Sequence, residues 1–189
     1  MSENTQLQKI DPKAIKWNEL ESMELSNKNK TVLRNYMLNQ PPAANWIKKH
    51  PLYKNEYLPI DKVEFLLTVF FKSWKVEIKS VFQIANSVCV TVRLFYQNPE
   101  TGEFDWQDGG GAAPMQVNAS TPEKKVNPMD SDEIKSNAVM LALPIAETNA
   151  IKDAADKIGK IFGRDLNRRD TLPYDVILKD FSDAKITEK

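Results

Sequence analysis

The chain has 189 residues, of which 41% are hydrophobic and 28% are charged, and only 6 are glycines. These values predict one folded domain with extensions and exclude a disordered or fibrous chain. Lys plus Arg and Asp plus Glu number 26 each, so any binding of nucleic acid must depend on local charge. No run approaches the roughly 20 apolar residues of a membrane span, and the polar start lacks a signal-peptide pattern. We therefore expect a cytoplasmic protein that does not contact the membrane.

The single cysteine and the single histidine limit the chemistry that this chain can perform. Cys89 has no second cysteine, which excludes a disulfide and a multi-cysteine metal cage. Its strand-like context, SVCVTVRL, favours a buried structural thiol. His50 lies in a loop-like stretch, so a Cys–His catalytic pair would be fortuitous. We predict no catalytic residue, no metal and no cofactor.

Residues 1–50 are expected to form a helical N-terminal extension. Asp11 and Pro12 can open a helix that runs to residue 25, and a second short helix is expected over residues 31–38. The loop QPPAANWIKKHP ends this extension. A core domain over residues 51–170 and a C-terminal tail over residues 171–189 complete the expected organisation.

The core begins with a predicted amphipathic helix over residues 62–72. Asp61 stands at a plausible N-cap, and Glu64 follows at the spacing of a capping box. Apolar residues then recur at helical spacing, namely Val63, Leu66, Leu67 and Phe70. This face is expected to pack on the core.

From Trp74 the hydrophobic period changes to two, which predicts β-strands. Residues 74–79 alternate as a half-buried strand, and residues 87–96 place Val88, Val90, Val92 and Leu94 on one face. The turn QNPETG leads into a strand over residues 103–107, which gives an antiparallel hairpin. The run DGGGA at residues 108–112 is expected to close that strand, where glycines permit unusual backbone angles or close approaches.

A polar loop over residues 116–130 is expected to precede a helical segment that starts at Ser131. The helix is expected to be kinked or restarted at Pro144 and to continue to about Phe162. Its projection forms an apolar face with Ile151, Ala154, Ala155, Ile158, Ile161 and Phe162, and a basic stripe with Lys157, Lys160 and Arg164. A solvated helix face explains the same charges, because Asp153 with Lys157 and Asp156 with Lys160 form i,i+4 pairs.

The core also resembles a known family. A helix, a Trp74-led strand, the strand SVCVTVRLFY, a turn, FDWQDGGGA and LPIAETNAIKDAADKIGKIFGRDLNRRD follow one another as in the phage Sak-like single-strand annealing proteins, relatives of the eukaryotic Rad-fifty-two protein. The resemblance covers about residues 57–170. It implies an α+β fold in which a curved antiparallel sheet with a β-hairpin packs on a long helix. It also implies homo-oligomers, as rings or helical filaments, that bind single-stranded DNA in a basic groove inside the host cell.

The resemblance assigns two lysines to the DNA backbone. Lys62, at the start of the first core helix, and Lys152, on the long helix, match basic residues that the family uses for this purpose. Asp153 and Asp156 stand where the eukaryotic relative has arginines, and Lys157, Lys160 and Arg164 are our candidates for the missing charge. The simpler alternatives are a surface lysine near a helix start for Lys62, and a partner of Glu147 or Asp156 for Lys152.

Annealing needs no covalent chemistry, because basic groups hold phosphates and leave bases free to sample a second strand. The segment GKIF at residues 159–162 is not a P-loop, because Ala154 and Ile161 occupy required Gly and Ser/Thr positions. A phage exonuclease or a host single-strand-binding protein is the expected protein partner. Tyr96, Phe104 and Trp106 could stack on bases, although core or interface packing is the commoner role of strand aromatics.

Two alternative functions remain open from the sequence. Asp61 followed by Glu77 and Lys79 resembles the PD…ExK arrangement of metal-dependent nucleases, in which two carboxylates hold a divalent ion beside a lysine. An N-cap and the solvent face of a strand explain these three residues as well. The second alternative is a nucleic-acid-binding module that does not anneal strands.

Overall fold

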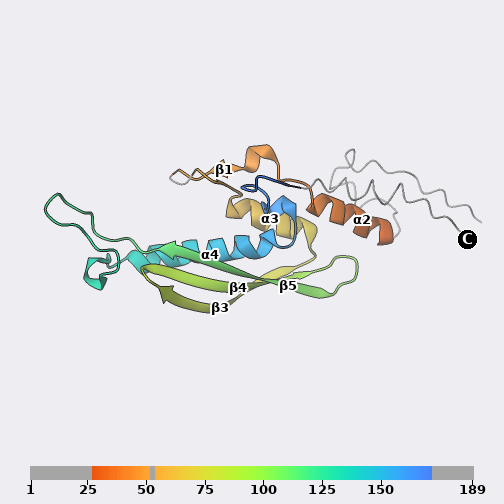
Figure 1. Ribbon diagram of the computed structural model, residues 1–189. Helices are drawn as coiled ribbons and strands as arrows, with labels where there is room; N and C mark the ends of the chain where they lie inside the picture. Colours follow the sequence, from red (N-terminus) through yellow and green to blue (C-terminus); the bar gives the residue numbers. More distant parts are fainter. Residues whose placement is uncertain (1–26, 52–53, 172–189) are drawn as a thin grey trace, which may run out of the picture.

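The computed structural model describes residues 27–51 and 54–171 and has an α+β fold, which confirms the predicted class (Figure 1). The helix expected over residues 11–25 and nearly all of the C-terminal tail lie outside the described residues. The helices are α2 (Asn27–Leu38), α3 (Ile60–Phe70) and α4 (Ala138–Asp156), and short 3-10 turns span Ala44–Trp46, Ser131–Glu133 and Lys160–Phe162. The strands are β1 (Lys48–Lys49), β2 (Glu56–Tyr57), β3 (Trp74–Ile84), β4 (Ser87–Gln97) and β5 (Phe104–Pro114).

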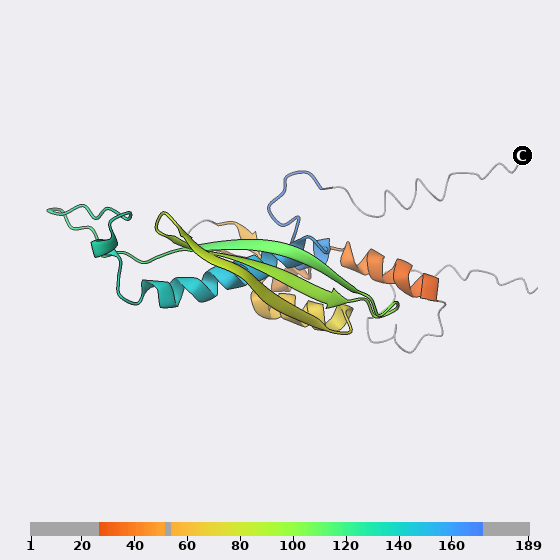
Figure 2. The same ribbon diagram turned by 90° about the horizontal axis from the view of Figure 1, so that it is seen from below.

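The main sheet is antiparallel, with the strand order β3-β4-β5. Its central strand alternates as the sequence predicts, because Val88, Val90, Val92 and Leu94 are all buried against the helices. Cys89, on the other face of this strand, is only partly buried, so the expected burial of its thiol is wrong. Figure 1 shows α3 and α4 on one side of this sheet, and Figure 2, seen from below, shows the opposite face in front. We call the face toward α4 the inner face and the opposite face the outer face.

Helix α4 lies unusually close to β5 because both elements carry small residues where they meet. A stripe of buried alanines at every fourth position faces the sheet, namely Ala138, Ala142, Ala146, Ala150 and Ala154. A Cβ atom at Gly109 would lie 2.1 Å from the carbonyl oxygen of Ala150, and one at Gly111 would lie 2.2 Å from that of Ala146. The expectation that residues 108–112 close the strand is therefore wrong. The glycines lie inside β5, where they admit the helix backbone.

Three polar side chains also bind the edge of β5 that faces away from β4. Two of them belong to α4, and the third belongs to the residue that follows it. Asn149 donates to the Ala112 carbonyl at 3.2 Å, Asp153 accepts from the Gly110 N–H at 3.0 Å, and Lys157 donates to the Asp108 carbonyl at 2.5 Å. The spacings match, because four helical residues rise about 6.0 Å and two strand residues about 6.7 Å. These backbone groups at the edge of the sheet are thus satisfied within the chain.

The ends of two helices differ from the sequence prediction. Helix α3 begins at Ile60 after Pro59, so Asp61 lies in its first turn and makes no capping bond. This removes the predicted capping box. Helix α4 begins at Ala138 rather than at Ser131, continues through Pro144, and ends at Asp156 rather than near Phe162.

Helix α4 stops early because the next turn packs against α2. Gly159 has an extended backbone, and a Cβ atom there would lie 2.4 Å from the carbonyl oxygen of Leu38. Leu38 belongs to the hydrophobic core, and Arg34 forms a largely buried ion pair with Glu100 at 2.6 Å. Helix α2 is therefore fixed to the β4–β5 turn as well as to the end of α4. None of the helices in residues 27–51 and 54–171 is long and apolar enough to cross a membrane.

Candidate nucleic-acid interface

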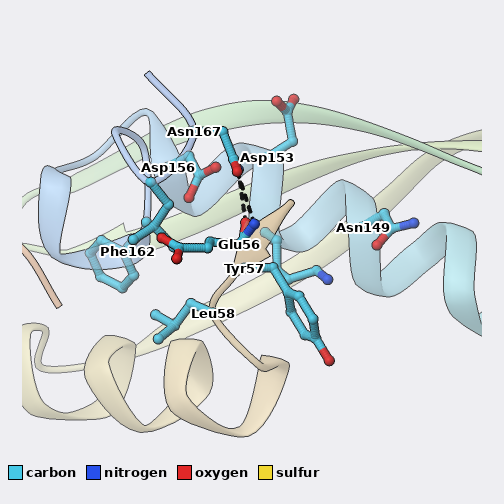
Figure 3. Close-up of a pocket in the computed structure, with 11 residues that line it drawn as sticks. Glu56, Tyr57, Leu58, Asn149, Asp153, Asp156, Phe162 and Asn167 are labelled. Atoms are coloured by element: carbon cyan, nitrogen blue, oxygen red, sulfur yellow. Dashed lines mark hydrogen bonds between the residues drawn. The ribbon is translucent and has the colours of Figure 1, made fainter. Parts of the chain in front are cut away.

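A small hairpin, β1–β2, lies close to both α3 and α4. Lys48 pairs with Tyr57 and Lys49 with Glu56 across this hairpin. Asn167, which follows α4, anchors it: its side chain accepts from the backbone N–H of Glu56 and donates to the Glu56 carbonyl, both at 2.8 Å (Figure 3). The hairpin is thereby held at the C-terminal half of α4.

Each of the two lysines that the resemblance assigns to DNA lies over an aromatic ring on or beside this hairpin. The Lys62 ammonium is 5.6 Å from the ring centre of Trp46, and the Lys152 ammonium is 5.4 Å from that of Tyr57. Both distances are within the range of cation–π attraction. We call Trp46, Tyr57, Lys62 and Lys152 the hairpin surface.

The surroundings of the two lysines differ. Lys62 is half-buried, forms an ion pair with Asp61 at 3.1 Å, and shares Trp46 with Phe65, whose ring meets the indole edge-on at 5.8 Å between centres. Lys152 is desolvated by burial, which lowers its pKa, and the nearby charge of Asp156 opposes that shift. Both lysines are thus positioned on aromatic rings, with a carboxylate nearby.

A pocket of about 190 Å³ opens beside Lys152. It is lined by residues of β2, the C-terminal half of α4 and the turn that follows, among them Tyr57, Asn149, Lys152, Asp156 and Asn167 (Figure 3). Asp156 is the most strongly perturbed carboxyl in it: burial, and then the charge of Asp153, raise its pKa to about 6. Lys152, Arg164 and Arg168 partly offset that rise. The charge of the pocket therefore changes as the pH passes through about 6.

The predicted basic stripe does not exist as one helix face, because α4 ends before Lys157. The Lys157 ammonium donates to the Asp108 carbonyl at the edge of β5 and forms an ion pair with Asp153 at 3.0 Å. Lys160 forms an ion pair with Asp165 at 3.0 Å, and both side chains are mostly buried. Arg164 donates to Asn39 of the loop after α2 at 3.4 Å. Lys157 thus binds the end of α4 to β5, and Arg164 binds the segment after α4 to the loop after α2, whereas Lys160 pairs within that segment.

The three residues of the nuclease alternative lie on two different surfaces. Asp61 is exposed on α3, which packs on the inner face of the sheet, and it pairs with Lys62. Glu77 is the register partner of Arg93 on the outer face, where it pairs with Lys79 at 3.2 Å. The fold therefore does not bring Asp61 together with the other two residues.

The aromatic residues that the sequence suggests for base stacking, on β4 and β5, lie on different faces of the main sheet. Tyr96 is buried on the inner face and donates to Asp105 at 3.1 Å. Phe104 and Trp106 remain exposed, and the Arg93 guanidinium lies 3.8 Å from the Trp106 ring centre. Core packing thus accounts for Tyr96 but not for the other two.

Sequence reasoning does not identify Trp46 and Tyr57 as site residues. Trp46 lies in the loop QPPAANWIKKHP, and its relation to Lys62 depends on the placement of the hairpin. The usable signal is that Trp46 lies close in sequence to Lys48 and Lys49, since nucleic-acid-binding surfaces combine aromatic rings with basic groups.

Comparison with models of known protein families finds no match. Comparison with curated proteins finds no significant relative. The resemblance to single-strand annealing proteins therefore stays a prediction.

Proposed function

We propose that this chain binds single-stranded DNA through the hairpin surface and anneals complementary strands without a nucleotide cofactor. The observation that carries the proposal is the pairing of Lys62 with Trp46 and of Lys152 with Tyr57. Proteins that bind single strands without sequence preference combine cations for the phosphates with aromatic rings for the bases. Here the lysines come from α3 and α4, and the rings come from β2 and from the 3-10 turn before β1.

We assign this activity to phage-type homologous recombination. The protein acts there as a homo-oligomer, a ring or helical filament, in the cytoplasm of the host cell, together with a phage exonuclease or a host single-strand-binding protein. Assembly supports DNA binding physically, because the chain has no net charge and the hairpin surface of each copy offers only two lysines, Lys62 and Lys152. Several copies on one strand gain the avidity that a single copy lacks.

The direct test is annealing of two complementary, fluorescently labelled oligonucleotides in EDTA and without ATP. The protein is expected to accelerate pairing, and Lys62→Ala and Lys152→Ala are expected to slow it. Lys79→Ala is the matched control, because Lys79 is an exposed lysine on β3, away from the hairpin surface. Pairing no faster than without protein contradicts annealing. Shortening of the strands in the presence of Mg²⁺ would instead indicate the nuclease.

A further inference from the structure

Strand β3 forms the edge of the main sheet that the chain leaves open. At the opposite edge, side chains from α4 and Lys157 bind the backbone of β5. Within the described residues, β3 pairs with β4 and with no strand on its other side. An unpaired edge of 11 residues presents a row of backbone donors and acceptors that can pair with another chain.

Only the first half of β3 carries features that discourage such pairing. Lys75, Glu77 and Lys79 place charges along it, and a β-bulge interrupts the register between Ile78 and Ser80. Charges and bulges on an edge strand oppose association with other strands. The second half, residues 80–84, has the sequence SVFQI and contains no charge.

Large apolar side chains are exposed on both faces of this second half. Val81 is 52% exposed on the inner face, and Phe82 and Ile84 are 44% and 60% exposed on the outer face. An exposed, uncharged and apolar edge segment marks an interaction site.

The direction of the backbone groups at this edge follows from β5. The N–H of Gly110 and the carbonyls of Asp108 and Ala112 point away from β4, since α4 and Lys157 bind them. Because these directions alternate along an antiparallel strand, Gly109 and Gly111 face β4. Gly109 and Gly111 pair with Val92 and Val90 of β4, so these two residues bond to β5. The neighbouring Cys89 and Thr91 then face β3, where they bond to Phe82 and Ser80. The backbone groups of Val81 and Gln83 must therefore point outward.

We propose that residues 80–84 of β3 pair antiparallel with the same residues of a second copy, with the two-fold axis at Phe82. In this register Val81 of each copy lies opposite Gln83 of the other, and the two pairs together form four backbone hydrogen bonds. Phe82 meets its own counterpart on the outer face, beside Ile84. No charged residue opposes another within the segment, and two neutral chains do not repel one another. The contact would join two sheets into one of six strands. A two-fold contact closes on itself at two copies, so the ring or filament proposed above needs a second, different contact between such pairs. The β3 contact does not depend on DNA binding.

Sedimentation velocity across a concentration series, without DNA, tests whether the edge mediates association. Val81→Lys is expected to weaken self-association by about tenfold or more, because it places a charge on the apolar edge. Val32→Lys is the matched control, since Val32 is 54% exposed on α2 and away from the sheet edge. A wild-type protein that stays monomeric, or equal effects of both variants, would overturn the proposal.

Cysteine cross-linking tests the register. Cys89→Ser is needed in every variant, because Cys89 lies opposite Phe82 within the chain. Phe82→Cys is then expected to form a covalent dimer on oxidation, because non-hydrogen-bonded partners have Cα atoms about 4.5 Å apart, within disulfide reach. Ser80→Cys should not, since its two copies lie about 13 Å apart along the strands in this register. Urea unfolding checks that both variants are folded. Equal cross-linking of the two, or none with Phe82→Cys, contradicts the two-fold contact.

Discussion

The charge of the pocket beside Lys152 depends on Asp156. Its carboxyl is half-buried among Lys152 and Asp153 of α4, the backbone of β2, and Arg164 and Arg168 of the following turn. Burial and the neighbouring Asp153 raise its pKa to about 6, so the ionised form is disfavoured in the folded protein. As the pH falls through about 6, Asp156 therefore takes up a proton and no longer offsets the charge of Lys152.

Asp156→Asn should stabilise the protein above pH 6 and change little near pH 4. A carboxyl with a raised folded-state pKa binds its proton more tightly when folded, so its contribution to stability is full below the unfolded pKa and is lost as pH rises through about 6. Urea unfolding at about pH 4 and about pH 7.5, on either side of this window, measures the difference. Glu64→Gln, at an exposed position on α3, controls for loss of any carboxylate. An equal gain at both pH values would contradict the predicted environment of Asp156.

The elements of the main sheet illustrate which features of this fold can be predicted from sequence. Alternating apolar residues predict β4 because one of its faces is buried, and the structure confirms that strand. Gly109 and Gly111 suggest a strand end in sequence, since glycine is typical of turns. Glycine is required at both positions because the backbone of α4 lies against them, a contact that local sequence does not reveal. Gly159 ends α4 for a similar reason, and so the predicted basic stripe does not share a helix face.

The three consecutive glycines of β5 should respond differently to alanine. Gly109→Ala and Gly111→Ala force a Cβ atom into the backbone of α4 and are expected to destabilise the fold by about 1–3 kcal/mol, as overpacked sites do. At Gly110 a Cβ atom would have no neighbour within 4 Å, so Gly110→Ala should be neutral or slightly stabilising. Urea unfolding of the three variants ranks them. A loss at Gly110 equal to that at its neighbours would show that strand geometry, not the helix contact, requires glycine.

At the scale of the whole molecule, attraction to DNA must come from a small surface, because the chain carries no net charge. The sequence indicates Lys62 and Lys152 through a family resemblance, but not the rings beneath them. The distance from Trp46 to Lys62, and from Tyr57 to Lys152, is set by how the hairpin packs beside two helices. Such contacts arise only in the folded chain, which is why the hairpin surface could not be predicted as a unit.

The salt dependence of single-strand binding should therefore report on individual lysines. Replacing Lys62 or Lys152 by Ala is expected to lower affinity for every DNA sequence alike. It should also reduce the log–log salt slope by about one unit or less for each phosphate that a copy no longer binds, because fewer counterions are released. Fluorescence anisotropy of a labelled oligonucleotide between low and moderate salt measures both effects. Lys79→Ala, whose charge is already paired with Glu77 on the outer face, should leave the slope unchanged. Slopes that match the wild type in both hairpin-surface variants would remove these lysines from the DNA interface and leave the exposed β1 pair, residues 48 and 49, as the next cations to replace.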